Sequence, residues 1–151
     1  MRRALLCIVV FCMVTGGFAL SDPDFNNGSG WTTNGSGDVT FNGRCVISKN
    51  LFDTVTEVYQ QEPSFSSGTW KATFYVDTVT MGSLQIGWQN ASATWKSGSN
   101  QTVSSAGTYE ITCDDSSYNW VVIQTVGSIV TASLESCNTE AVSSVDSWEL
   151  Y

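Results

Sequence analysis

The chain has 151 residues, the size of one domain, and it contains no histidine. The missing histidine removes the usual general base, the usual catalytic-triad partner and histidine zinc ligands. Its 14 acidic residues outnumber the 6 basic ones, which excludes a surface that follows nucleic-acid phosphates and argues against binding to anionic membranes.

The first segment is predicted to be a signal peptide, residues 1–19. Arg2 and Arg3 precede an apolar stretch at 4–14, and the small-residue pattern at 17–19 favours cleavage after Ala19. Cleavage after Ser21 is the second choice. An uncleaved membrane anchor is the alternative, because the apolar run 4–20 almost reaches spanning length. We therefore expect a secreted or cell-surface protein whose domain is residues 20–151.

The mature domain is expected to be strongly acidic and poor in disulfides. Without Arg2 and Arg3, four basic residues face 14 acidic ones, a net charge of −10. Three cysteines remain, so one bridge at most is possible. Cys113 with Cys137 is the simplest pair if their strands are neighbours. The alternative is that Cys45, Cys113 and Cys137 are all small buried residues.

Short strands separated by turns are predicted from residue 38 to the end of the chain. Serine, threonine, glycine, valine and aromatic residues dominate, and glycine, serine or asparagine clusters separate the runs. The pattern indicates an all-β fold, a β-sandwich or jelly roll of two antiparallel sheets. The expected strands are 38–42, 45–48, 55–61, 69–78, 83–89, 101–104, 108–113, 120–126, 128–135 and 144–150.

Alternation within the strongest strands predicts which residues form the core. In 69–78 the apolar side chains at 70, 72, 74 and 76 share one face, and in 83–89 those at 84, 86 and 88 do so. The strand 120–126 is apolar on both faces at its start. We therefore expect that strand to be central.

The order of these segments resembles one known group of proteins. The chain opens with Asp-Pro-Asp-Phe-Asn at 22–26 and a Gly-x-Gly-Trp at 28–31. A strand ending in Gln at 58–61 leads through a Ser-Ser-Gly turn to the strand 69–76, and an Asp-containing segment at 145–150 closes the chain. This arrangement resembles the cellulose- and xylan-binding jelly-roll carbohydrate-binding modules of the galactose-binding-domain-like superfamily.

The resemblance also implies a structural calcium ion between the two chain ends. Asp24, Asn26 and Asp146 would supply oxygen ligands, together with backbone carbonyls. Two departures weaken this expectation: the family usually has Glu where Asn26 stands, and often has a second acid where Ser147 follows Asp146. The alternative is that Asp24 and Asp146 cap turns at strand ends.

A glycan site is expected where aromatic faces and side-chain amides share the polar face of one sheet. Aromatic rings pack against the C–H surface of a pyranose while amides bond its hydroxyl groups. Trp95 is expected to be exposed in the turn 93–96. The predicted ligand-binding residues are Tyr59, Gln61, Tyr75, Gln85, Gln89, Trp95, Trp120 and Gln124.

Three functions follow as hypotheses. The first is a secreted, non-catalytic module that binds a neutral polysaccharide or surface glycan. The second is a structural or adhesive protein of a cell surface, fibre or virion with the same fold. The third is a small glycosidase that uses two carboxylates among Glu57, Glu62, Glu110 and Asp77, although no motif places two of them together.

Overall fold

In a computed structural model of the chain, residues 20–142 are described. All their regular elements are antiparallel strands, and none of these residues forms a helix able to cross a membrane. The predicted signal peptide and the predicted last strand, with Asp146, lie outside the described residues. The strands are β1 (Thr32–Asn34), β2 (Asp38–Phe41), β3 (Cys45–Lys49), β4 (Glu57–Gln61), β5 (Thr69–Gln89), β6 (Trp95–Val103), β7 (Gly107–Cys113) and β8 (Trp120–Val142).

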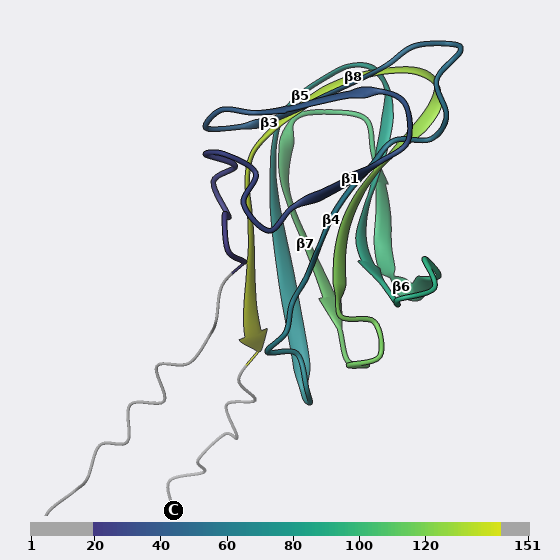
Figure 1. The fold of residues 1–151 in the computed structure, drawn as a ribbon. Coiled ribbons are helices and arrows are strands. Elements are labelled where there is room, and N and C mark those ends of the chain that lie inside the picture. Colours follow the sequence, from purple (N-terminus) through teal and green to yellow (C-terminus); the bar gives the residue numbers. More distant parts are fainter. Residues whose placement is uncertain (1–19, 143–151) are drawn as a thin grey trace, which may run out of the picture.

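Two long strands, β5 and β8, run side by side through both layers of a sandwich. Figure 1 shows them bending at the top of the view, with the yellow C-terminal end of β8 descending at the left. Residues 83–89 of β5 pair with residues 120–126 of β8, and residues 69–81 pair with 131–142. Register shifts between Tyr75 and Ser83 mark the bend.

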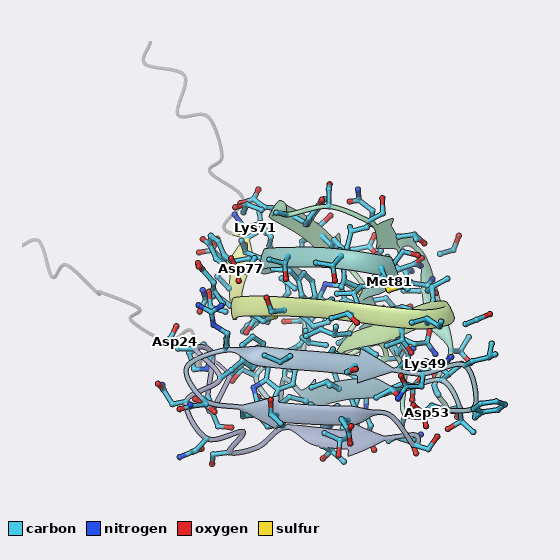
Figure 2. All side chains as sticks on the ribbon, turned by 90° about the horizontal axis from the view of Figure 1, so that it is seen from above. Asp24, Lys49, Asp53, Lys71, Asp77 and Met81 are labelled. Atoms are coloured by element: carbon cyan, nitrogen blue, oxygen red, sulfur yellow. The ribbon has the colours of Figure 1, made fainter. Side chains whose placement is uncertain are left out.

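Each half of this long strand pair carries its own neighbours. The first layer has the order β1-β4-β8-β5-β6 and uses the first half of β8 and the second half of β5. The second layer has the order β2-β3-β8-β5-β7 and uses the other halves. In Figure 2, which looks down on the bend, Asp77 and Met81 mark the part of β5 that crosses between the layers.

The core lies between the two layers and is built by the predicted alternation. Trp70, Ala72, Phe74 and Val76 are buried on β5, and Leu84, Ile86 and Trp88 are buried further along the same strand. The core is closed on one side by the N-terminal segment, where Phe25 packs against Trp31 with ring centroids 5.1 Å apart. The predicted central strand 120–126 is confirmed, because it pairs with β4 on one side and β5 on the other.

The sequence-based strand assignment was wrong in several places, and one is the end of β8, which runs to Val142 although the expected strand ended at residue 135. The strand β1 was interpreted as part of a glycine-rich turn, and β6 begins at Trp95 rather than at residue 101. The segments around Gly82 and Gly127 were interpreted as turns, whereas the strands bend there and continue. Both glycines have positive φ angles. Glycine adopts such angles in turns as well as in bends of this kind, so the sequence does not distinguish the two.

The disulfide between Cys113 and Cys137, considered on the condition that their strands are neighbours, is contradicted by the topology. β5 lies between β7 and β8: Cys113 is opposite Trp70 and Cys137 is opposite Phe74. Strands on either side of a third are about 10 Å apart, too far for a bridge. Cys45, Cys113 and Cys137 are free and buried, as the alternative interpretation expected.

Candidate functional site

Seven of the eight predicted ligand-binding residues occupy the outer face of the first layer. The pairing register places them in three rows that cross the strands. The first row is Glu57-Gln124-Gln85-Thr102, the second is Tyr59-Val122-Gly87-Asn100, and the third is Gln61-Trp120-Gln89-Trp95. Cross-strand partners project from the same face of a sheet, so these residues share one surface, which we call the amide–aromatic face.

Tyr75 does not belong to this face, and its grouping with the other seven was wrong. It lies on the part of β5 that pairs with Thr108 of β7 and Ser136 of β8, in the second layer. Its neighbours there include Lys71, Glu110 and Glu140. The alternation along β5 was correct, but the strand changes layer between Tyr75 and Gln85, which alternation does not reveal.

The amide–aromatic face is hollowed by a pocket of about 210 Å³. Predicted residues Tyr59, Gln89 and Trp120 line it. The lining residues that the sequence interpretation missed are Asn34, Glu57, Asn90, Ala91, Ala93 and Val122. Glu57 and Val122 alternate with the inward-facing residues of their strands, so the strand pattern alone could have predicted that they lie on this face. Asn34 was hidden by the missed strand β1.

Aromatic rings form one side of the pocket. Tyr59 and Trp120 lie edge to face, with centroids 5.5 Å apart and planes at 67°. Val122, the cross-strand partner of Tyr59, points outward yet is only 1% exposed, because its neighbours on the face cover it. Val122 therefore forms an apolar base in the pocket beside the two half-buried rings.

Polar groups of two kinds face these rings. Glu57 Oε1 accepts a hydrogen bond from Gln124 Nε2 at 2.7 Å, which holds the carboxylate in place. Gln89 is 4% exposed, and its Nε2 atom has no hydrogen-bond partner among the described residues. An unpaired buried amide donor is costly, so a ligand oxygen or a water molecule that reached the Gln89 amide from the pocket would relieve that cost.

The β5–β6 turn forms a rigid wall at one end. Asn90 Oδ1 accepts hydrogen bonds from the backbone N–H groups of Ser92 and Thr94, each at 3.0 Å. Further bonds join Asn90 N–H to the Thr94 carbonyl and Ala93 N–H to the Asn90 carbonyl. Ala93 adopts a left-handed φ of 56°. This turn contains Ala91 and Ala93, two of the lining residues.

A second amide pair lies beside the pocket on β5 and β6. Gln85 Nε2 donates to Asn100 Oδ1 at 3.0 Å, and Asn100 Nδ2 donates to the Lys96 carbonyl at 2.7 Å. Gly87 lies next to this pair and has no side chain. The β6 backbone takes the space that a side chain at Gly87 would fill, since a Cβ atom there would lie 2.4 Å from the Ser99 carbonyl oxygen. The face between the pocket and the edge strand β6 is consequently polar.

The four carboxylates considered for catalysis are dispersed. Asp77 forms an ion pair with Arg44 at 2.9 Å, and Glu110 forms one with Lys71 at 3.0 Å. Glu62 is buried and accepts a hydrogen bond from Thr139 Oγ1 at 2.6 Å. Among the described residues that line the pocket, Glu57 is the only carboxylate.

The predicted calcium ligands are partly described. Asp24 and Asn26 are exposed, and Asp146 lies outside the described residues. The buried carboxylate of this segment is that of Asp22, which accepts the backbone N–H groups of Asn26, Asn27 and Gly28. Residues 20–142 contain no cluster of three histidine, cysteine, aspartate or glutamate side chains that could hold a metal ion.

No family model and no curated protein matches the chain. Solved structures do match it. TmCBM61, solved in complex with β-1,4-galactotriose, has a TM-score of 0.59 at 12% identity, covering 82% of this chain and 97% of that one. A mutant of CBM29-2, solved in complex with mannohexaose, has a TM-score of 0.52 at 15% identity, covering 75% and 83%.

A third match is to an enzyme domain. The enzymatically active domain of tailspike protein 4 of bacteriophage CBA120 has a TM-score of 0.54 at 15% identity. The match covers 79% of this chain but only 20% of the tailspike chain. Together these likenesses show that the chain has the jelly-roll fold of carbohydrate-binding modules, as its sequence resemblance implied.

Proposed function

We propose that the chain is a secreted, non-catalytic carbohydrate-binding module that holds a neutral glycan in the pocket of the amide–aromatic face. One observation carries this proposal: the aromatic pair Tyr59 and Trp120 lines the same pocket as Gln89, whose buried amide has no hydrogen-bond partner among the described residues. Aromatic faces and amide donors are the two groups that sugar rings require. The solved relatives bound to galactotriose and mannohexaose support the same class of ligand.

The charge of the pocket favours an uncharged sugar. Its described lining contains Glu57 but no lysine or arginine, so a uronic acid, a sialic acid or a sulfated sugar would meet repulsion without a compensating cation. A single carboxylate also supports a binding role over hydrolysis, because glycosidases typically need a pair of carboxyl groups about 5 to 10 Å apart.

The test is binding of the full chain to a neutral-glycan array and to insoluble polysaccharides. Trp120→Ala is expected to lower the affinity for the retained glycan about fivefold or more, since a stacked ring contributes about 1 kcal/mol. Tyr75→Ala is the matched control, an aromatic residue in the second layer, and should leave affinity unchanged. Equal loss in both variants, or retention by no glycan, would exclude this proposal.

A structural or adhesive role is the alternative, and one observation favours it. Leu51 and Phe52, in the loop between β3 and β4, are exposed, Phe52 at 95%, and so is Met81. Figure 2 shows Asp53 of this loop and Met81 at the same end of the molecule. Exposed apolar side chains that gather in one patch mark contacts with other molecules. Self-assembly at micromolar concentration that Phe52→Ser abolishes, without glycan retention, would establish this alternative.

Calcium binding at the chain ends remains part of the proposal. Asp24 and Asn26 are accessible to a cation, and oxygen ligands of this kind suit calcium. A calcium site would raise the melting temperature when calcium is added after EDTA treatment. The Asp146→Ala variant should lose that increase.

A further inference from the structure

We infer that the pocket takes one terminal sugar ring, so that the protein recognises the ends of glycan chains and not their interior. This inference rests on the proposed function and concerns the same site. It follows from the size of the pocket, from the sides on which it is closed, and from the position of its unpaired donor.

The size of the pocket limits what it can hold. It measures about 210 Å³, which is below the roughly 300 Å³ at which sites for drug-sized ligands begin. One pyranose ring is smaller than such a ligand, and two linked rings are comparable with it. The pocket therefore holds one ring.

The lining residues stand on three sides of the pocket. Tyr59 and Glu57 stand on β4, and Asn34 stands beyond them on β1. Trp120 closes the end of β8, and the hydrogen-bonded turn after Asn90 closes the end of β5. A polysaccharide running through the site would need two open sides, and the fixed turn removes one of them.

None of the described lining residues comes from the edge strand β6, so we place the opening of the pocket on that side. Gly87 lies there as the cross-strand partner of Val122 and presents no side chain. Beyond it stands the amide pair Gln85–Asn100. The second ring of a bound chain would leave the pocket toward β6 and meet this amide pair.

The unpaired donor of Gln89 favours a terminal ring over an internal one. Gln89 lines the pocket, and its Nε2 atom is buried behind the pocket surface with no partner among residues 20–142. A hydroxyl oxygen of the terminal ring would satisfy it. Because an internal ring has one hydroxyl fewer, replaced by the glycosidic linkage, the terminal ring offers the larger set of partners to Gln89 and Glu57.

The test uses oligosaccharides of one to six rings from the β-1,4-galactan and β-1,4-mannan series and from every neutral series that an array retains. For the series that binds, we expect affinity to rise from one ring to two or three and then stay within threefold up to six. Methylation of the terminal hydroxyls at the recognised end should lower affinity at least tenfold. Separate arms with a reduced sugar end and with a capped non-reducing end identify which end is bound.

Two variants connect these results to the structure. Gln89→Leu, of similar volume, should lower the affinity for every length at least tenfold while leaving the melting temperature unchanged or higher, since it removes an unpaired buried donor. Gln85→Ala should weaken binding of two or more rings several-fold and leave binding of the methyl monosaccharide unchanged. A loss of folding in Gln89→Leu would be visible in its melting curve. In that case Gln85→Ala still tests whether the second ring of a bound chain lies at the Gln85–Asn100 pair.

The outcomes separate the two proposals. Affinity that increases steadily to six rings, or that is insensitive to capping of both ends, overturns recognition of chain ends while leaving carbohydrate binding intact. Retention of no glycan overturns the proposed function and this inference with it. A plateau after two or three rings together with sensitivity to one capped end supports both.

Discussion

At the residue scale, one buried carboxylate organises the N-terminal segment. Asp22 accepts three backbone N–H groups at 2.7–3.1 Å, and Trp31 Nε1 donates to the Asp22 carbonyl at 2.8 Å. Burial raises the pKa of the Asp22 carboxyl, but the hydrogen bonds from Asn26, Asn27 and Gly28 lower it, and the net shift is downward. Folding therefore favours the charged form of this group.

The first prediction follows from that shift. Because the pKa in the folded state lies below the ordinary value of 3.8, the stabilisation by Asp22 is complete above that value and is lost as pH falls through the lower folded-state pKa. Asp22→Ala should lower the free energy of unfolding by about 2 to 3 kcal/mol at pH 7, since bonds to a charged acceptor are strong. The difference from wild type should shrink at the most acidic pH. Urea titrations from pH 7 to pH 2.5 measure both effects.

The control for this variant is Asp24→Ala, measured in EDTA. Asp24 is two residues away and exposed, so its loss should change stability by less than about 0.5 kcal/mol. Equal destabilisation by the two substitutions would show that the turn depends on local charge and not on the hydrogen bonds of Asp22.

At the element scale, the bends of β5 and β8 decide the architecture. Gly82 lies in the bend of β5 with a φ of +68°, and a Cβ atom there would lie 2.5 Å from the Ile129 carbonyl oxygen. Gly43 has the same φ of +68° but no atom within 4 Å of such a Cβ. The two glycines therefore separate the cost of the backbone conformation from the cost of a clash.

The second prediction compares these two positions. Gly43→Ala should cost about 1 kcal/mol, because only the left-handed backbone conformation is penalised. Gly82→Ala should cost at least about 1 kcal/mol more, because the bend must also move away from Ile129. Chemical denaturation of both variants gives the difference. Equal losses of unfolding free energy in the two variants would mean that the bend adjusts to the added methyl group at no cost. The close contact between β5 and β8 would then not be what holds the bend in place.

The same bends explain what the sequence could and could not predict. The inward faces at Trp70–Val76 and Leu84–Trp88 follow from local alternation, because a strand has a period of two whichever sheet it joins. Whether a strand changes layer depends on contacts distant in sequence. Gly82 and Gly127 therefore resembled turns, and Tyr75 was assigned to the wrong layer. The pocket was predicted through Tyr59, Gln89 and Trp120, whereas its wall at Asn90–Ala93 depends on where the β5–β6 turn folds.

At the scale of the whole molecule, the core excludes solvent from all three described thiols. Burial raises the pKa of the Cys45 thiol to about 12 and raises that of Cys137 well above its ordinary value. The neutral thiol is a poor nucleophile, so burial and a raised pKa both suppress reaction.

The third prediction is a labelling pattern. N-ethylmaleimide should leave Cys45 and Cys137 unmodified in the native protein for hours at pH 7.5, and should modify both within minutes in 6 M guanidinium, because labelling then requires unfolding. Peptide mass spectrometry assigns each site. A reducing agent should leave the melting temperature unchanged. A drop under reduction, or a bridged peptide, would contradict free cysteines.

The passage of β5 and β8 through both layers also has a consequence for how the molecule unfolds. A sandwich whose sheets are joined only by loops can lose one sheet first, but here neither layer can separate without breaking strands of the other. We expect a single cooperative unit in amide hydrogen exchange, with residues 70–76 and 84–88 opening together at the global free energy. Ligand binding to the native state stabilises the whole unit. An oligosaccharide bound over β4 and β8 should then slow amide exchange in the distant pairing of β5 with β7 by the same factor as in β4 and β8.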